Sequence, residues 1–174
     1  MKHLLTKNPA FGQMIDERVI PSLHYIDKLV IMDLMYSGIE DEIPKMKGLR
    51  KMKIPGYVHI SEWNQFLPNL PNLRTLDLSS RYTDDHNDEE RLTIYKLTNL
   101  TKLTVGGSTT DEDVEGLINL TKLRIVTDRV RISDASVSRL TNLTELYFRA
   151  HFVRTITSQC LERLTKLQKL SLIA

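Results

Sequence analysis

The chain has 174 residues, of which 41% are hydrophobic and 26% are charged, and its formal net charge is +2. This length suits one domain with a substantial core, and the near-neutral charge by itself predicts neither a nucleic-acid nor a membrane partner. Cys160 is the only cysteine, so an internal disulfide is excluded and a reducing compartment is favoured. The N-terminal residues lack the apolar core of a secretory signal, and no apolar run approaches the roughly 20 residues of a membrane-spanning helix. We therefore expect a cytoplasmic protein.

Residues 1–18 precede the repeated part of the chain and fit none of its units. Asn8 followed by Pro9 predicts a helix start, because proline is favoured at the first position of a helix. Phe11 and Met14 on that helix would then pack against the first unit. We expect residues 1–18 to form an N-terminal cap, since the ends of repeat arrays need covering.

From residue 19 onward the chain contains an internal repeat. The stretch LTNLTEL at 140–146 returns nearly unchanged at 97–103, 117–123 and 164–170. Aligning these copies on their second leucine places apolar residues at offsets −6, −3, 0, +3 and +5, and three sets upstream match the same pattern. All 35 positions of the seven sets are apolar, which chance does not explain in a chain that is 41% hydrophobic. The anchors at offset 0 are Ile26, Leu49, Leu73, Leu100, Leu120, Leu143 and Leu167.

Within each unit the spacing of the apolar residues changes. Offsets −6, −3 and 0 suit one face of a short α- or 3₁₀-helix, and offsets +3 and +5 suit a strand with one buried face. The pairs Thr110-Asp111 and Ser133-Asp134 predict helix starts, because their side-chain oxygens can accept from unpaired backbone N–H groups. Each unit is therefore predicted to be a short helix, a tight turn and a short strand. Glycine or asparagine, which tolerate a left-handed turn conformation, precedes five anchors, at Gly48, Asn72, Asn99, Asn119 and Asn142.

The strand segments carry the pattern Leu-x-x-Leu-x-Leu or a close variant, strongly at 73–78, 100–105, 120–125, 143–148 and 167–172 and more weakly at 49–54 and 26–31. This pattern resembles the leucine-rich-repeat family. The resemblance implies one α/β domain over 1–174, a right-handed solenoid of about seven repeats over 19–174 with the last incomplete. A parallel concave β-sheet would line one side and short helices the convex side. The family usually has Asn or Cys three residues after the last strand leucine, and this chain does not, so the resemblance is to a divergent subtype without the Asn ladder.

No pattern of catalytic or metal-binding residues is present in the sequence. The five histidines form no HExxH motif, and a lone cysteine excludes a cysteine-paired zinc site. The acid-rich segment 81–91 has no calcium-loop pattern and predicts a charged surface loop. Cys160 precedes the core position Leu161, which favours a buried structural thiol over a nucleophile. We expect no enzyme activity, no cofactor and no metal.

The non-leucine positions of the predicted strands, at offsets +1, +2, +4 and +6, form the predicted concave face. They hold ten basic and three acidic residues, so this face carries +7 while the rest of the chain carries −5. A column of like charges on neighbouring strands costs stability unless solvent or a partner relieves it, so both a solvated face and a binding face explain the pattern. Tyr147 is the best candidate for a binding hot spot. The candidate partner-binding residues are Lys28, Arg50, Lys51, Lys53, Arg74, Lys102, Lys122, Arg124, Tyr147, Arg149 and Lys169.

The resemblance implies a recognition scaffold, and the basic face suggests an acidic segment of a partner protein as its ligand. One alternative is a nucleic-acid or polyanion binder, which the modest pI of about 8.6 and the scarcity of aromatic residues on the face disfavour. Another alternative is a substrate-recognition subunit or effector adaptor of a larger enzyme complex, in the host cytosol if the protein is an effector. The last predicted strand, which ends in LSLIA, lacks a polar cap and predicts a possible homodimer contact.

Overall fold

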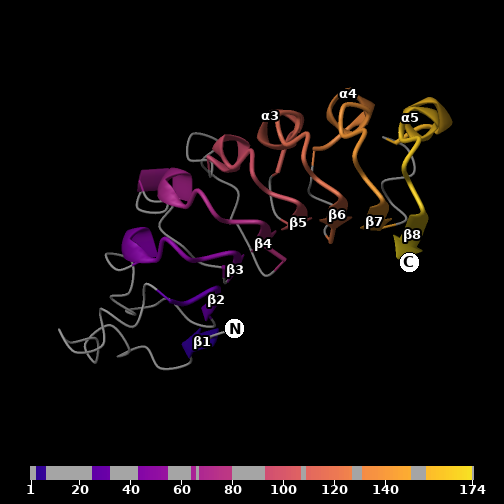
Figure 1. Ribbon diagram of the computed structural model, residues 1–174. Helices are drawn as coiled ribbons and strands as arrows, with labels where there is room; N and C mark the ends of the chain where they lie inside the picture. The colour runs from indigo at the N-terminus through magenta and orange to yellow at the C-terminus, as the bar shows by residue number, and fades with distance from the viewer. Residues whose placement is uncertain are drawn as a thin grey trace.

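The computed structural model describes residues 3–6, 25–31, 43–54, 64–65, 67–79, 93–106, 109–126, 131–149 and 156–173. These residues wind into an arc, with strands along its inner edge and helices along its outer edge (Figure 1). Eight parallel strands form one sheet in chain order. They are β1 (His3–Thr6), β2 (Lys28–Ile31), β3 (Lys51–Lys53), β4 (Thr75–Asp77), β5 (Lys102–Val105), β6 (Lys122–Ile125), β7 (Glu145–Arg149) and β8 (Lys169–Ile173).

Among the described residues a short helix precedes each strand from β3 to β8, but it is shorter than the apolar spacing of three predicts. The helices end at offset −6 or −4, and the residues at offsets −3 and 0 lie in the segment between helix and strand. The earlier units use three-residue 3₁₀-helices and the later units use short α-helices. They are η2 (Ile43–Lys45), η3 (Leu67–Asn69), η4 (Ile94–Lys96), α3 (Asp111–Val114), α4 (Asp134–Val137) and α5 (Ser158–Arg163). The predicted α/β leucine-rich-repeat solenoid with helices outside and a parallel sheet inside is confirmed.

The repeated apolar positions form a single continuous core. All five members of each of the five central units, from Ile43 to Phe148, are buried. The core also contains Ile132 and Ile156, which the five-offset pattern omits. They stand just before the N-caps of α4 and α5, where an apolar side chain commonly packs on the first turn of the helix. Stacking of neighbouring coils thus removes from water the leucine face that no unit could bury alone.

The last unit differs in its exposure, because β8 is an edge strand of the sheet. Leu170 and Leu172 expose 44% and 54% of their surface, whereas Leu164 in the same unit is buried. The predicted homodimer contact would use this apolar edge, and it stays a prediction.

The sequence pattern predicts seven strands, and the structure has one more. β1 pairs with β2 in register, from His3 beside Lys28 to Thr6 beside Ile31. Four residues without an upstream leucine pair carry too little periodicity to signal a repeat, which is why this strand was missed. The helix expected after Asn8 lies outside the described residues.

Asparagine side chains in the turns before the strands link successive coils, at a different position from the family's Asn ladder, whose predicted absence stays a prediction. The positions where the family usually places asparagine lie outside the described residues. The four asparagines before the anchors, predicted only as turn formers, each donate a side-chain N–H to a backbone carbonyl of the preceding coil at 2.9–3.0 Å. The pairs are Asn72 to Lys47, Asn99 to Pro71, Asn119 to Thr98 and Asn142 to Ile118.

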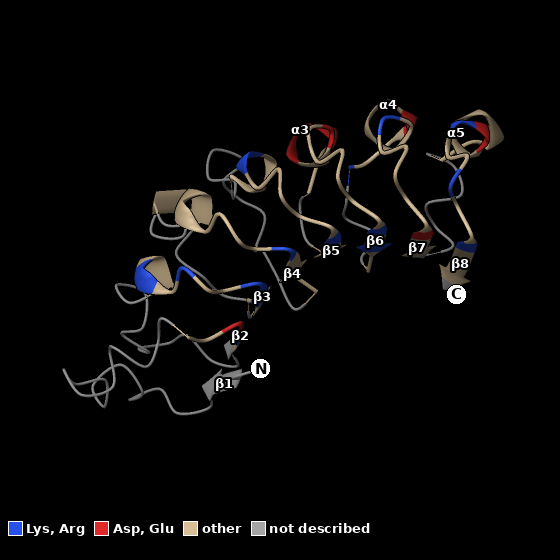
Figure 2. Ribbon diagram, in the orientation of Figure 1, with Lys and Arg blue, Asp and Glu red and all other residues tan. Residues whose placement is uncertain are grey.

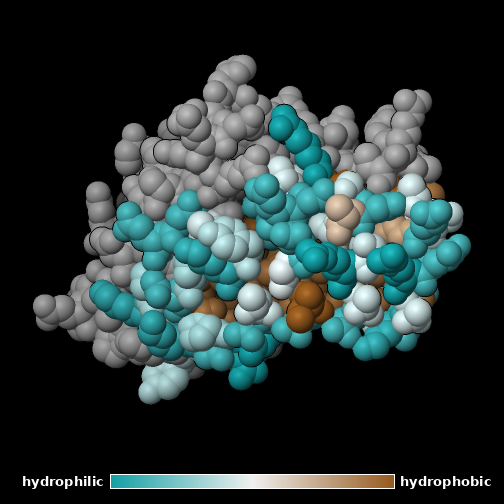
Figure 3. All heavy atoms as spheres, turned by 90° about the horizontal axis from the view of Figure 1, so that it is seen from above, coloured by the Kyte–Doolittle hydropathy of each residue, from teal (hydrophilic) through white to brown (hydrophobic). Residues whose placement is uncertain are grey.

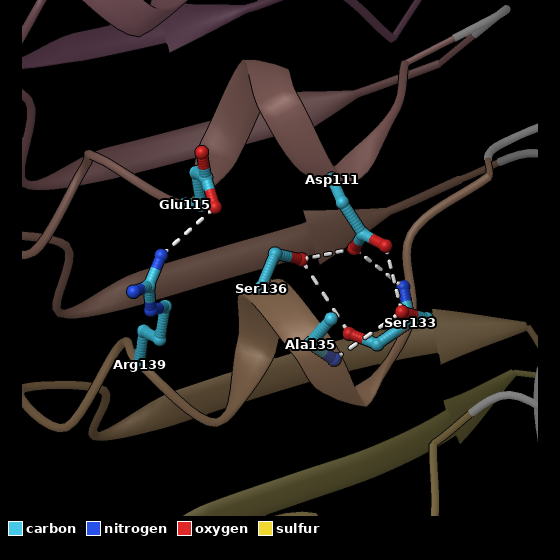
Figure 4. Close-up of polar contacts among 6 residues, drawn as sticks. All are labelled: Asp111, Glu115, Ser133, Ala135, Ser136 and Arg139. Atoms are coloured by element: carbon cyan, nitrogen blue, oxygen red, sulfur yellow. Dashed lines mark hydrogen bonds and ion pairs between the residues drawn. The ribbon is translucent and has the colours of Figure 1, made fainter.

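The helix starts are linked from coil to coil by carboxylates on the outer edge. Asp111, the first residue of α3, accepts hydrogen bonds from the backbone N–H of Ser133 at 2.8 Å and from its hydroxyl at 2.7 Å (Figure 4). Ser133 is itself the N-cap of α4 and accepts from the N–H of Ala135 at 3.2 Å, as predicted. Asp134 repeats the link one coil later, since it accepts from the N–H of Thr157 at 2.8 Å. Each carboxylate thus accepts hydrogen bonds from polar groups at the start of the next helix, which would otherwise have no partner within the helix.

Acidification is expected to weaken the α3–α4 link. Partial burial acts to raise the pKa of Asp111, but hydrogen bonds from Ser133 and Ser136 outweigh it and hold the pKa below its ordinary value. A depressed folded-state pKa means that the carboxylate stabilises the fold above the unfolded pKa of about 3.9 and that this contribution is lost as the pH falls through the folded value. Asp111→Asn should therefore lose less stability than the wild type between neutral and acid pH.

Urea unfolding at neutral pH and near pH 3 measures this difference. Glu162→Gln is the matched control, because Glu162 lies exposed on α5. Equal pH dependence in Asp111→Asn and the wild type would contradict the role given to Asp111.

Candidate interaction surface

The register of the parallel sheet aligns residues from different repeats into rows across the strands. The first row, at offset +2, follows direct strand pairing through Lys28, Lys51, Thr75, Lys102, Lys122, Glu145 and Lys169. The second row, at offset +4, runs through Val30, Lys53, Asp77, Thr104, Arg124, Tyr147 and Ser171. Adjacent strands lie about 4.8 Å apart, so lysines about twenty residues apart in the chain become neighbours. Figure 2 shows the basic positions at β3, β5, β6 and β8 and an acidic one at β7.

Side-chain burial alternates along these strands between the core and the concave side. On β5, Leu103 and Val105 are buried while Lys102 is exposed, and on β6, Leu123 is buried while Arg124 is exposed. Because successive strand residues point to opposite faces, the two rows lie on the face opposite the leucines. The sheet therefore presents the basic residues of the two rows on the inner side of the arc.

Tyr147 lies at the centre of a charged cluster on β6, β7 and β8. The ammonium groups of Lys122 and Lys169 lie 4.9 Å and 5.2 Å from the centre of its ring. Its hydroxyl donates to Glu145 Oε2 at 2.6 Å, and the same oxygen accepts from Lys122 Nζ at 2.9 Å. Cations favour the electron-rich face of an aromatic ring, so both lysines orient the tyrosine.

These contacts shift the acid–base properties of the cluster. The hydrogen bonds from Tyr147 and then from Lys122 hold the pKa of Glu145 below its ordinary value. The interaction with Tyr147 is the main cause of a raised pKa for Lys169. At neutral pH the cluster therefore holds one carboxylate between two ammonium groups, with Arg124 beside Tyr147 in the register.

Three other predicted site residues, Lys53, Arg74 and Arg50, have different surroundings in the structure. Lys53 pairs with Asp77 at 3.6 Å, so its charge is partly compensated within the sheet. Arg74 directs its guanidinium to backbone carbonyls, including those of Pro71 at 3.3 Å and Asn99 at 3.4 Å. Arg50 is exposed in the turn before β3. Arg50 and Arg74 stand at offset +1, which the structure assigns to the turn before the strand and not to either row.

The role of offset +1 is visible in the later repeats. The hydroxyls of Thr101, Thr121 and Thr144 donate at 3.0–3.1 Å to the carbonyl of the residue at the same offset in the preceding coil. The recurrence of threonine at one offset is a sequence signal that could have marked this position as part of the turn. Arg149 ends β7 beside Ile173, and its side chain lies outside the described residues.

Among the cations of the two rows, four have neither an ion pair nor an aromatic contact within the described part of the chain, namely Lys28, Lys51, Lys102 and Arg124. Unpaired, solvent-accessible charges on one face are the groups with which an oppositely charged ligand can pair at the lowest desolvation cost.

The opposite side of the molecule has a different character. Seen from the helix side, the described surface is mostly hydrophilic, with small apolar areas between the polar ones (Figure 3). Ile118 and Tyr95 are the large apolar residues exposed on the segments between η4 and β6, at 55% and 47%. Isolated exposed apolar residues are common on protein surfaces and indicate no interface by themselves.

Groups suited to metal binding do not gather in the parts of the chain that the structure describes. No cluster of three or more His, Cys, Asp or Glu residues there could hold a metal ion. Burial, reinforced by the nearby charge of Asp134, raises the pKa of Cys160 to about 12, so its thiol stays protonated at neutral pH. None of the described helices is long and apolar enough to cross a membrane.

Comparison with known proteins identifies the fold. No protein-family model matches the sequence, and no curated protein matches it significantly. The structure resembles an internalin, InlF, from Listeria monocytogenes, with a TM-score of 0.59 and 21% identity over 89% of this chain and 44% of that one. It also resembles a chain of the Drosophila Toll–Spatzle complex, with a TM-score of 0.67 and 16% identity over 98% of this chain and 23% of that one.

A third similar structure is that of TLR13 in complex with the RNA ssRNA13, with a TM-score of 0.53 and 19% identity over 85% of this chain and 26% of that one. The chain thus spans less than half the length of each of these proteins. At such identities the likeness establishes architecture and not activity. Together with the repeated leucine core and the parallel sheet, it shows that this chain has the leucine-rich-repeat fold.

Proposed function

We propose that the chain is a protein-recognition module that binds an acidic segment of a partner protein across its concave face. The observation that carries this proposal is the alignment of Lys28, Lys51, Lys102 and Arg124 on one face without ion pairs among the described residues. An acidic ligand would relieve the repulsion within the rows, and complementary charge would speed its encounter. The Toll–Spatzle complex, in which a protein of this fold meets a protein ligand, supports the general mode.

Titration of the purified chain with a fluorescent acid-rich peptide tests the proposal. We expect saturable binding that weakens as salt rises, because screening acts most strongly on exposed charges. The control is a peptide of the same length in which serine replaces every acidic residue, and it should bind more weakly at every salt concentration. Equal affinity for both peptides, or an affinity independent of salt, would reject an electrostatic recognition face.

A nucleic acid is the second candidate ligand, and the complex of TLR13 with RNA is the observation that keeps it in view. One feature of this chain weighs against it. Proteins that hold single strands stack bases on open aromatic rings, and the Tyr147 ring is already approached by Lys122 and Lys169. Filter binding of a mixed-sequence single-stranded nucleic acid at low salt distinguishes the two candidate ligands. Retention of the strand with an affinity comparable to that for the acidic peptide would favour the nucleic acid.

The expected setting follows from the proposed role. We propose that the chain acts in the cytoplasm as the recognition part of a larger assembly, for example as an adaptor that brings a substrate to an enzyme.

A further inference from the structure

The basic side chains of the two rows that have neither an ion pair nor an aromatic contact among the described residues lie in two separate patches. The N-terminal patch consists of Lys28 on β2 and Lys51 on β3, which are direct partners in the register. The central patch consists of Lys102 on β5 and Arg124 on β6, with Lys122 beside Lys102. One strand, β4, lies between the two patches and contributes no basic residue to either row.

The strands beside the patches carry acidic groups. On β4, Asp77 pairs with Lys53 at 3.6 Å and accepts from the N–H of Ser79 at 2.9 Å, which holds its carboxylate in place. On β7, Glu145 is held by Lys122 and Tyr147. Over β4 and β7 the acids are paired with neighbouring lysines, so a negative group of a ligand would meet no unpaired cation of the rows there, and it would be attracted to the unpaired cations over β2–β3 and over β5–β6.

From this alternation we infer that the partner segment carries two acidic clusters, each seated on one patch, with an uncharged spacer crossing β4. This inference rests on the proposed function and specifies its ligand. The centres of the patches are three strand spacings apart, about 14 Å at the backbone. An extended peptide advances about 3.3–3.5 Å per residue, so the two cluster centres are about four residues apart in the ligand.

Three synthetic peptides of identical composition test the spacing. In SGDESGDESG the acidic pairs have centres four residues apart, in SGSDEDEGSG the four acids are contiguous, and in DESGSGSGDE the centres are eight residues apart. The first peptide is expected to bind the intact chain about threefold to tenfold more tightly than the other two, because it alone reaches both patches with an extended spacer. Net charge and composition are constant, so bulk electrostatics cannot produce this order.

Variants of the protein identify the patches. Lys28→Gln/Lys51→Gln should reduce the affinity for SGDESGDESG to that for SGSDEDEGSG, and it should leave the affinity for SGSDEDEGSG nearly unchanged. Lys45→Gln/Lys47→Gln is the matched control, because these lysines lie on η2 and the following turn and not on the strands. Thermal unfolding of each variant verifies that the fold is retained.

The possible results distinguish a failure of this inference from a failure of the proposed function. Equal affinity for the three peptides, with all binding lost in Lys102→Gln/Arg124→Gln, would overturn the two-cluster ligand and retain an acidic-segment binder. Absence of binding by every peptide at low salt would overturn both. The predicted rank order, together with its loss in Lys28→Gln/Lys51→Gln, would establish both.

Discussion

Replacing Leu146 with alanine is expected to lower the free energy of unfolding by about 2–5 kcal/mol. Leu146 is fully buried in the middle of β7, and its register partners are Leu123 on β6 and Leu170 on β8. The substitution removes apolar contact area and leaves a cavity that the stacked coils fill only in part. In a repeat array each coil is stabilised by its two neighbours, so the loss acts on both interfaces of this coil.

Leu170→Ala is the matched control for this prediction, because it makes the same chemical change at the same position of the repeat. Leu170 already exposes 44% of its surface, so its replacement should cost less than about 1 kcal/mol. Urea unfolding followed by circular dichroism measures both values. Equal losses for the two variants would show that the leucine column is not buried between coils as the structure has it.

Reversing three charges, with Lys102→Glu, Lys122→Glu and Arg124→Glu, is expected to weaken binding of the acid-rich peptide by at least about a hundredfold. The change removes the central patch and leaves Glu145 beside a newly acidic strand, so a carboxylate of the ligand meets repulsion where it met attraction. The net charge of the chain falls from +2 to −4. The slope of affinity against salt should also become smaller or change sign, because screening then relieves repulsion.

A control with the same net charge distinguishes the face from the bulk charge. Lys47, Lys96 and Arg163 are exposed and lie outside the strands, in a turn, on η4 and on α5. Their joint replacement by glutamate should retain most of the affinity, since exposed charges farther than a Debye length of about 10 Å are largely screened at ordinary salt. If both triple variants lost binding equally, net charge and not the concave face would govern recognition.

Much of the fold was predictable because the repeat is a packing pattern. A leucine recurring at five offsets has to lie on one face of each unit, and only stacking of the units can bury that face. The strands at +2 to +5 followed from the spacing of those side chains, whereas the helices end at offset −6 or −4 and the predicted helical positions −3 and 0 lie in the segment that follows them. β1 was missed because its four residues, HLLT, follow no helix pattern, and pairing with β2 is what makes them a strand.

The candidate site was predictable in its charge and less so in its contacts. Lysine at offset +2 indicated a basic row, and the register places these lysines on adjacent strands. The sequence grouped Arg74 with them, yet its guanidinium lies against turn carbonyls. Glu145 was counted only as one of three acids beside ten bases, whereas its hydrogen bonds from Lys122 and Tyr147 make it part of the charged cluster on β6, β7 and β8.

The sequence by itself determined the repeated coil, the leucine core and the excess of positive charge on one face, because these depend on spacing along the chain. Only the tertiary structure decided which charges are compensated, that turn asparagines link successive coils, and that the basic face is divided into two patches by β4. The physical reason is that periodicity sets which face a side chain occupies. The partner of a side chain depends on distances between coils about twenty residues apart, which are set by sheet register and by turn geometry.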